Sequence, residues 1–272
     1  IALATLLALE SGSIAVVQWQ IPNQHLSFLD EKPVPLSRTE DGIIAYTWNH
    51  FLDHPDQPDW LLRNPMVKGS NRALDAVEDY VKQKFNHSIK KWVVCGASKR
   101  GWTTWILAAY DQAHEKRIVG FMPMVMSFLN MRNQFHAWWQ NMGGWSFALQ
   151  DYYSMNFTQK FDSSAADQMA SIIDPLSYAE RYANIPYMQI MASGDEFFQL
   201  SDTALYWDKL PGEKYLLICE NAEHSLISSL LDMLPSMVSF YRSVVDNVKR
   251  PQVAWKLDRE NGKITMQSDV PP

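Results

Sequence analysis

Three features that define large classes of protein are scarce in this sequence. Its 272 residues include only two cysteines, too few for a disulfide scaffold or a cysteine-based metal site. The formal net charge is −6, so the chain lacks the basic excess that binding to nucleic acid phosphates requires, and we expect no nucleic-acid partner. The apolar run at residues 1–9 is too short to span a bilayer, and we expect no membrane span in this segment.

What is present is typical of a globular chain with one large core, since 47% of the residues are hydrophobic and 20% are charged. We interpret residues 1–9 as the last turns of a helix in a chain whose true N-terminus is absent, so a signal peptide is neither indicated nor excluded. Two glycosylation sequons, at Asn86 and Asn156, are compatible with a secreted, extracellular protein, which is the location we expect.

Short apolar runs alternate with longer amphipathic segments, a pattern typical of βαβ units and a mostly parallel sheet flanked by helices. The pattern predicts strands at 13–20, 91–95, 118–124, 187–192 and 214–219. It predicts helices at 39–50, 71–85, 102–110, 202–210 and 225–247. Residues 125–185 are rich in aromatic residues and show helical periodicity, so we interpret them as a helical cap inserted into the α/β domain.

The pattern changes after Pro251. Two alternating runs, 253–257 and 264–266, flank Asn261-Gly262, a dipeptide that favours the tight turn of a β-hairpin. We therefore predict an α/β domain over 1–248 and the start of a C-terminal β-rich module, or a tail, over 249–272.

The strand predicted at 91–95 runs directly into residues 96–101 (GASKRG) and then a helix. A sharp strand-to-helix turn of this kind lifts a serine hydroxyl above the sheet and points backbone N–H groups at a developing oxyanion. Ser98 is therefore the candidate nucleophile. The pattern is G-x-S-x-x-G and not the usual G-x-S-x-G, because Arg100 stands where a second glycine is normally found. The alternative is an ordinary small-residue turn before a helix.

An acid and a histidine follow later strands, in the chain order serine, acid, histidine that such a sheet requires. Asp195 comes just after the strand at 187–192, and His224 lies in the loop after 214–219. Because the carboxyl ends of parallel strands share one edge, these side chains and Ser98 are expected to converge there. The alternatives are that Glu196 is the acid, or that Asp195 and His224 are ordinary turn and surface-loop residues.

The predicted mechanism is double displacement, in which the histidine takes the serine proton and the aspartate holds the imidazole tautomer. The oxyanion donors are expected to be the backbone N–H of Lys99 and one from the loop at 20–24, with Gln20 and Ile21 as candidates. The side chains of Lys99 and Arg100 either add positive potential beside the oxyanion or are neutralised by acidic partners.

In the inserted region His136, Trp138 and Trp139 are candidates to line a substrate pocket. Two other interpretations are that the tryptophans form the core of the cap or a carbohydrate-binding surface. The sequence contains no metal-ligand cluster, phosphate-binding loop or dinucleotide motif, so we expect no metal and no cofactor. Cys95 and Cys219 fall on strands that two others separate, beyond the about 4.4–6.8 Å between Cα atoms of a disulfide, so both are expected to be unpaired.

Four segments resemble the PhoPQ-activated pathogenicity-related protein family, namely residues 21–24 (IPNQ), 38–48 (RTEDGIIAYTW), 96–105 (GASKRGWTTW) and 193–198 (SGDEFF). The resemblance spans about residues 10–250 and implies an α/β-hydrolase fold, a β-rich C-terminal region and a usually secreted protein. Ser98, Asp195 and His224 match the positions expected of the catalytic triad. Relative to a complete fold of this kind, the strands before residue 13 are missing here. The serine motif is also similar to that of the glucuronoyl esterases, which use a different acid arrangement.

These observations predict a serine hydrolase that cleaves an ester or peptide carbonyl of a small molecule or peptide through an acyl-enzyme. The resemblance implies no settled substrate, and some members of the family act as secreted signals. The alternative is therefore a secreted signalling or binding protein on a hydrolase scaffold with an idle triad, whose partner would be a cell-surface receptor. Glu40, Asp41 and Asp151 are candidates by type for holding the amine of a peptide, and they leave peptidase and esterase undecided.

Overall fold

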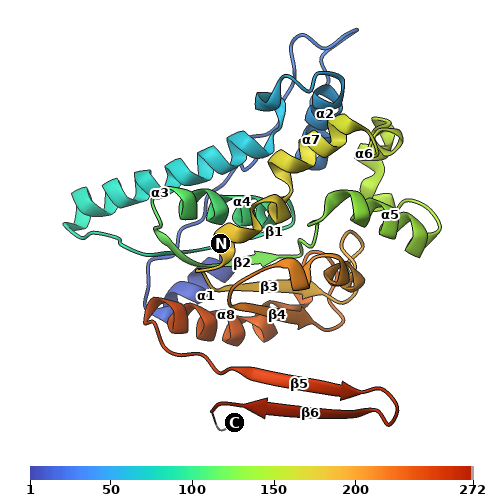
Figure 1. Cartoon of the computed structure of the whole chain (residues 1–272). Coiled ribbons are helices and arrows are strands. Elements are labelled where there is room, and N and C mark those ends of the chain that lie inside the picture. Colours follow the sequence, from blue (N-terminus) through green and yellow to red (C-terminus); the bar gives the residue numbers. More distant parts are fainter. Residues whose placement is uncertain (271–272) are drawn as a thin grey trace.

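The computed structural model describes residues 1–270 and centres on a four-stranded parallel sheet with the strand order β1-β2-β3-β4 (Figure 1). The strands are β1 (Trp92–Ala97), β2 (Ile118–Met124), β3 (Tyr187–Ala192) and β4 (Lys214–Cys219). They are four of the five strands that the sequence predicts, and the interior strand β3 is buried along its whole length. Cys95 on β1 and Cys219 on β4 lie on opposite edge strands and are both unpaired, as predicted.

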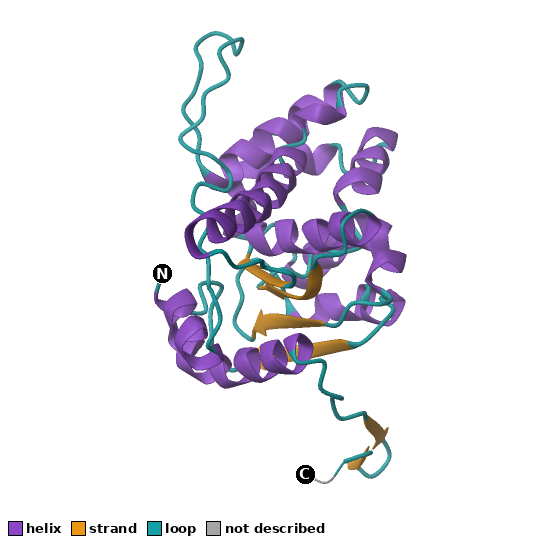
Figure 2. Ribbon diagram, turned by 90° about the vertical axis from the view of Figure 1, so that its left-hand side faces the viewer, coloured by secondary structure: helices purple, strands orange, loops and turns teal. Residues whose placement is uncertain are grey.

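Helices cover both faces of the sheet, as the buried strands of a parallel sheet require (Figure 2). One face carries α3 (Arg63–Phe85) and α4 (Lys99–Ala113), and the other carries α1 (Ala2–Ser11) and α8 (Leu230–Val245). Helix α4 packs on β1 and β2, and α8 packs on β2 and β4. The sheet, its two helical layers and the helices inserted after β2 form an α/β-hydrolase fold. No helix in residues 1–270 is long and apolar enough to cross a membrane.

Between β2 and β3 the regular structure of the chain is helical. The elements are α5 (Met131–Met142), α6 (Gln150–Ser154), α7 (Ser164–Ile173) and the 3-10 helices η2 (Phe147–Leu149), η3 (Phe157–Gln159) and η4 (Pro175–Tyr182). Helix α2 (Glu40–Asp53) packs against α6 and α7. The ring centroid of its Trp48 lies 4.9 Å from that of Tyr152 and 5.6 Å from that of Trp102 on α4. The inserted helices, α2 and α4 therefore share one aromatic core.

The strand predicted at 13–20 is wrong, because this segment is extended but pairs with no strand among the described residues. The residues on either side of this segment are anchored to other elements: α1, which precedes it, packs on α8, and Ile21, which follows it, lies against Gly69 of α3. Between these anchors the segment lines a cavity that β1 also lines. Without a ladder partner its apolar side chains face solvent, with 58% of Ile14 and 67% of Trp19 exposed.

The helix predicted at 202–210 is wrong as a single element. Two 3-10 helices, η5 (Leu200–Leu205) and η6 (Trp207–Lys209), meet instead at Tyr206, whose φ of −141° interrupts the helical backbone. Tyr206 is fully buried and its hydroxyl donates to the Gln189 side chain at 3.0 Å, so tertiary packing overrides the helical pattern. Other boundaries shift: α3 begins at Arg63 after η1 (Pro58–Trp60), and η7 (Ile227–Ser229) precedes α8.

The predicted C-terminal hairpin is present as β5 (Val253–Asp258) and β6 (Lys263–Ser268), an antiparallel pair that extends away from the sheet and its helices (Figure 1). Gly262 in the turn has a φ of 69°, the left-handed conformation that glycine adopts without strain. One face of the hairpin is apolar and exposed, and it consists of Val253, Trp255, Leu257, Ile264 and Met266. The division of the chain at 248–249 stays a proposal.

Candidate active site

Ser98 lies on the turn that joins β1 to α4, with φ 57° and ψ −125°. This conformation is strained for a residue with a side chain, and it turns the chain sharply from strand to helix. A Cβ on Gly96 would stand 2.6 Å from the Arg100 carbonyl oxygen, and one on Gly101 would stand 2.8 Å from the Met124 carbonyl oxygen. Only glycine at these two positions lets α4 approach β1 and β2 so closely. Gly101 thus permits the close packing of helix on strand that, in the usual motif, a second glycine one position earlier permits.

Asp195 and His224 form a hydrogen-bonded pair. The imidazole Nδ1 lies 3.0 Å from each carboxylate oxygen, and the Asp195 side chain is only 1% exposed. The same carboxylate accepts the backbone N–H groups of Phe197 and Phe198 at 2.8 and 2.9 Å. Because Nδ1 donates to the carboxylate, the second ring nitrogen, Nε2, is left as the basic one. The pair has the geometry of an oriented general base.

The rival acid, Glu196, has a different role in the structure. Its Oε2 accepts the backbone N–H of His224 at 3.1 Å and makes no hydrogen bond to the imidazole among the described residues. Glu196 therefore positions the loop that carries the histidine, while Asp195 orients the ring.

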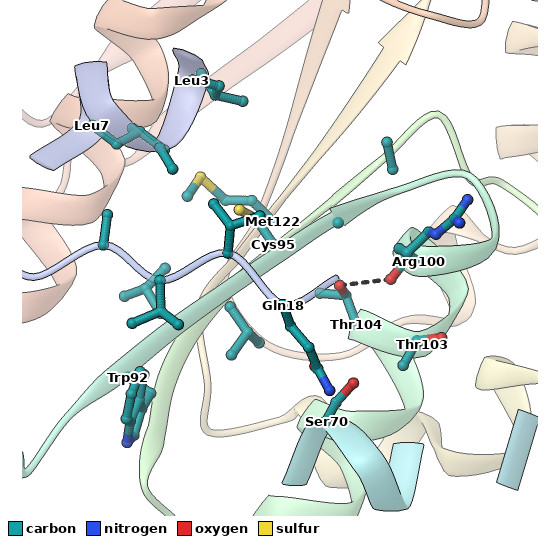
Figure 3. Close-up of a pocket in the computed structure, with 18 of the residues that line it drawn as sticks. Leu3, Leu7, Gln18, Ser70, Trp92, Cys95, Arg100, Thr103, Thr104 and Met122 are labelled. Carbon is teal, nitrogen blue, oxygen red and sulfur yellow. Dashed lines mark hydrogen bonds between the residues drawn. The ribbon is translucent and has the colours of Figure 1, made fainter. Parts of the chain in front are cut away.

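Ser98 and His224 line one large cavity of about 700 Å³, bounded by α1, residues 13–21, α3 and β1. Figure 3 shows its largely apolar wall, with Leu7, Cys95 and Met122 close together. In the described part of the chain no hydrogen bond joins the serine to the histidine, as is common before substrate binds. Ser98 and the imidazole that Asp195 orients therefore face the same cavity.

The side chains beside the serine are ion-paired. Lys99 Nζ lies 2.9 Å from both Glu40 Oε2 and Asp41 Oδ2, and Arg100 donates two hydrogen bonds of 2.7 Å to Glu40. Burial opposes ionisation of Glu40, yet the hydrogen bonds from Arg100 and Lys99 outweigh it and lower its pKa to about 2. Gln24 adds to the cluster by donating to Glu40 Oε1 at 2.7 Å and accepting its backbone N–H. The cluster supports the acid-paired interpretation of Lys99 and Arg100.

The three backbone donors proposed for the oxyanion are placed differently. The Lys99 N–H is at the first turn of α4, where an amide has no partner within the helix, and it makes no hydrogen bond in residues 1–270. Ile21 lines the large cavity, whereas Gln20 is exposed, lines neither cavity of the site and accepts the Gln24 N–H through its side chain. Because residues 13–20 are not a strand of the sheet, the sheet does not hold the following loop beside the serine.

A second, small cavity of about 30 Å³ also reaches Ser98 and Lys99. Its wall is mostly aromatic and aliphatic: Ile44, Trp48, Trp102, Phe128, Phe135, Trp138, Leu149, Phe197 and Phe198, with Asp41, Arg63 and Tyr152 as polar members. Trp138 lines this cavity, and its role in binding a substrate stays a prediction. His136 and Trp139 do not line it, because α5 turns them outward; Trp139 is 49% exposed and His136 Nε2 lies 2.9 Å from Asp162.

Arg63 is a site residue that sequence reasoning missed, because nothing in its local pattern marks it. It is 2% exposed, donates to the Lys99 carbonyl oxygen and, at 3.1 Å, to Thr103 Oγ1, and lies over the Trp102 ring at 4.4 Å. Burial lowers the pKa of the guanidinium to about 9. Arg63 therefore holds the first turn of α4, next to the nucleophile, from the side of α3.

Of the three acids that are candidates for holding a peptide amine, two are already paired with basic side chains. Glu40 and Asp41 are neutralised by the basic side chains described above, and Asp41 also accepts the Tyr152 hydroxyl at 3.0 Å. Asp151 is exposed as a residue, but partial desolvation of its carboxyl group and the nearby Asp41 raise its pKa. Across residues 1–270, no three His, Cys, Asp or Glu side chains are grouped so that they could hold a metal ion.

Comparison with known proteins gives one family and several similar folds. The sequence profile of the PhoPQ-activated pathogenicity-related protein family matches residues 2–271. The "Autocrine proliferation repressor protein A" of Dictyostelium discoideum is 37% identical over 271 residues, which are 96% of this chain and 52% of that protein. The chain thus spans about half the length of this curated relative.

Two solved structures are similar in fold. An acylaminoacyl peptidase of Pyrococcus horikoshii has a TM-score of 0.47 and 13% identity, over 66% of this chain and 28% of that one. The protein Est1E of Butyrivibrio proteoclasticus has a TM-score of 0.43 and 14% identity, over 64% of this chain and 68% of that one.

Proposed function

We propose that this chain, which belongs to the PhoPQ-activated pathogenicity-related protein family, is a serine hydrolase that cleaves an ester or peptide carbonyl. The observation that carries the proposal is the hydrogen bond between the buried Asp195 carboxylate and the partly buried His224, in a site where the histidine shares a cavity with a serine on a strained strand-to-helix turn. A buried carboxylate that orients a histidine beside such a serine is the arrangement used to activate a hydroxyl nucleophile.

In the proposed reaction the Ser98 hydroxyl oxygen attacks the carbonyl carbon while its proton moves to His224 Nε2. The carbonyl oxygen becomes an oxyanion, for which the unpaired Lys99 N–H is a donor at the start of α4. The bond to the leaving oxygen or nitrogen then breaks, and the leaving group takes the proton from the imidazolium. Water, deprotonated by His224, attacks the acyl-enzyme, and the proton returns to Ser98 as the acid departs.

Asp195 has two roles in this scheme. It holds the imidazole in the tautomer whose Nε2 is basic, and it stabilises the positive charge that the ring gains during each proton transfer. Both roles need a carboxylate that neither rotates nor exchanges with water. The two backbone N–H groups that it accepts and its burial supply this condition.

Covalent labelling with a fluorophosphonate, read by intact mass, tests the proposal without any choice of substrate. We expect one adduct, mapped to Ser98, and none in Ser98→Ala. Ser70→Ala is the matched control, because Ser70 lines the same large cavity from α3, and it should label like the parent chain. An unlabelled but folded parent chain, or labelling that survives Ser98→Ala, would refute the assignment.

A second candidate function rests on the relative rather than on the site. The curated relative at 37% identity is described as a repressor of proliferation, which suggests a secreted signal that acts through a cell-surface receptor. The exposed apolar face of the β5-β6 hairpin is a surface that such a receptor could cover. If the growth-repressing effect of added protein is the same for Ser98→Ala and the parent chain, signalling does not need hydrolysis. If Ser98→Ala loses the growth-repressing effect, signalling depends on hydrolysis.

A further inference from the structure

Two cavities of very different size meet at the nucleophile. Ser98 and Lys99 line both the large cavity of about 700 Å³ and the small cavity of about 30 Å³. A carbonyl carbon bonded to the Ser98 oxygen can therefore direct one substituent into each cavity. His224 lines the large cavity and is absent from the wall of the small one.

The position of the histidine decides which part of a substrate enters which cavity. The group that leaves must take its proton from the imidazole, so the leaving oxygen or nitrogen has to lie on the side of the serine where His224 stands. That side is the large cavity. The acyl chain, which stays attached to the carbonyl carbon, is then directed into the small cavity.

Resting on the proposed hydrolase function, we propose that the small aromatic cavity binds the acyl part of the substrate and limits it to acetyl and propionyl groups. A cavity needs about 10–15 Å³ to hold one water-sized group, so about 30 Å³ holds only two or three. An acetyl or propionyl chain fills this space. A chain of six or more carbons requires the wall to move.

The wall resists change because Trp138, one of its largest members, is held by groups outside the cavity. Trp138 donates its indole N–H to the buried carboxylate of Asp202 at 2.9 Å, and its ring stacks on Phe128 with the centroids 5.0 Å apart. Asp202 also accepts the Ser127 hydroxyl at 2.8 Å. Moving Trp138 outward would leave a buried carboxylate with one partner fewer, so the wall resists expansion.

Turnover of a series of p-nitrophenyl esters tests the inference. The acetate, propionate, hexanoate and octanoate are compared by kcat/KM, with Ser98→Ala as the background. We expect kcat/KM to fall at least about tenfold from propionate to hexanoate, because a methylene that does not fit such a pocket costs about 10-fold or more. A profile that is flat, or that rises toward octanoate, would overturn the inference.

Leu149 allows a direct change of the cavity's size. It lines the small cavity from η2 in the inserted region and is 6% exposed. Leu149→Ala is expected to raise the hexanoate-to-acetate ratio of kcat/KM about tenfold. Leu149→Phe is expected to lower the propionate-to-acetate ratio of kcat/KM. If the alanine variant fails to fold, this second variant tests the acyl assignment. Leu210→Ala is the matched control, since Leu210 is 2% exposed and lines neither cavity, and its profile should equal the parent's.

Failure of this inference and failure of the hydrolase function give different results. If fluorophosphonate does not label Ser98, the hydrolase function fails. If Ser98 is labelled but the esters show no preference for short chains, or none reacts, only the acyl assignment fails. If the Leu149 and Leu210 variants change the ester profile equally, the wall does not select the chain and the assignment is again overturned.

Discussion

Asp195→Asn changes one atom of the proposed site and leaves its shape intact. Both backbone N–H groups that hold this side chain, from Phe197 and Phe198, donate to the same oxygen, Oδ1, which asparagine keeps. The loop is therefore expected to retain its conformation. The new amide nitrogen would face the imidazole as a donor, which favours the tautomer of His224 with its hydrogen on Nε2.

A histidine in that tautomer cannot accept the Ser98 proton, and it loses the carboxylate that stabilises the imidazolium. The site offers no substitute, because Asp195 is 1% exposed and water does not reach it. We expect kcat to fall by about 10³–10⁴, which corresponds to about 4–5 kcal/mol of lost transition-state stabilisation. The measurement is single-turnover release of p-nitrophenol from p-nitrophenyl acetate, with thermal unfolding as the check on folding.

Glu196→Gln is the matched control for this substitution. Its side chain accepts only the backbone N–H of His224, at 3.1 Å, and a glutamine oxygen can accept the same bond. A change within about fivefold is expected, since one neutral acceptor replaces a charged one. The reverse ranking of the two variants would identify Glu196 as the acid. Equal small losses would refute the idea that a carboxylate orients the base.

Two further predictions concern the scaffold around the serine. Gly101→Ala places a Cβ 2.8 Å from the Met124 carbonyl oxygen, so the free energy of unfolding measured in urea should fall by about 1–3 kcal/mol. Gly144→Ala is the control, because a Cβ there meets open space and the free energy of unfolding should change little. Equal effects of the two substitutions would contradict the close approach of α4. Glu40 has its pKa lowered from 4.5 to about 2, so its share of stability is present above about pH 4.5 and is lost as pH falls toward 2. Unfolding free energy measured over that range should be flatter for Glu40→Gln than for the parent chain, and parallel curves would contradict the ion-pair cluster.

The sheet could be predicted from the sequence because its strands are short apolar runs bounded by turn residues. The runs at 118–124, 187–192 and 214–219 form strands with these bounds. The segment 13–20 is also a short, mainly apolar run, but it is not a strand. A strand needs a hydrogen-bonded neighbour, and whether one lies within reach depends on where distant elements hold the ends of the segment.

In the inserted region the exposure of side chains likewise depends on tertiary structure and not on the local pattern alone. Its helical periodicity is local, but the burial of each aromatic depends on how α5 is rotated against neighbours such as α7 and η5. Trp138 faces the small cavity while Trp139, one residue on, is 49% exposed. Arg63 had no local signal, because its partner is the first turn of a helix 36 residues further along the chain.

By itself, then, the sequence determined the alternation of strands and helices and the order in which a serine, an acid and a histidine follow their strands, because hydrophobic period and turn chemistry act between near neighbours in the chain. Only the tertiary structure decided that Asp195 and not Glu196 meets the imidazole, that Glu40 and Asp41 neutralise Lys99 and Arg100, and that a small aromatic cavity adjoins the serine. Those outcomes depend on distances and directions between elements far apart in sequence, which folding and close packing set together.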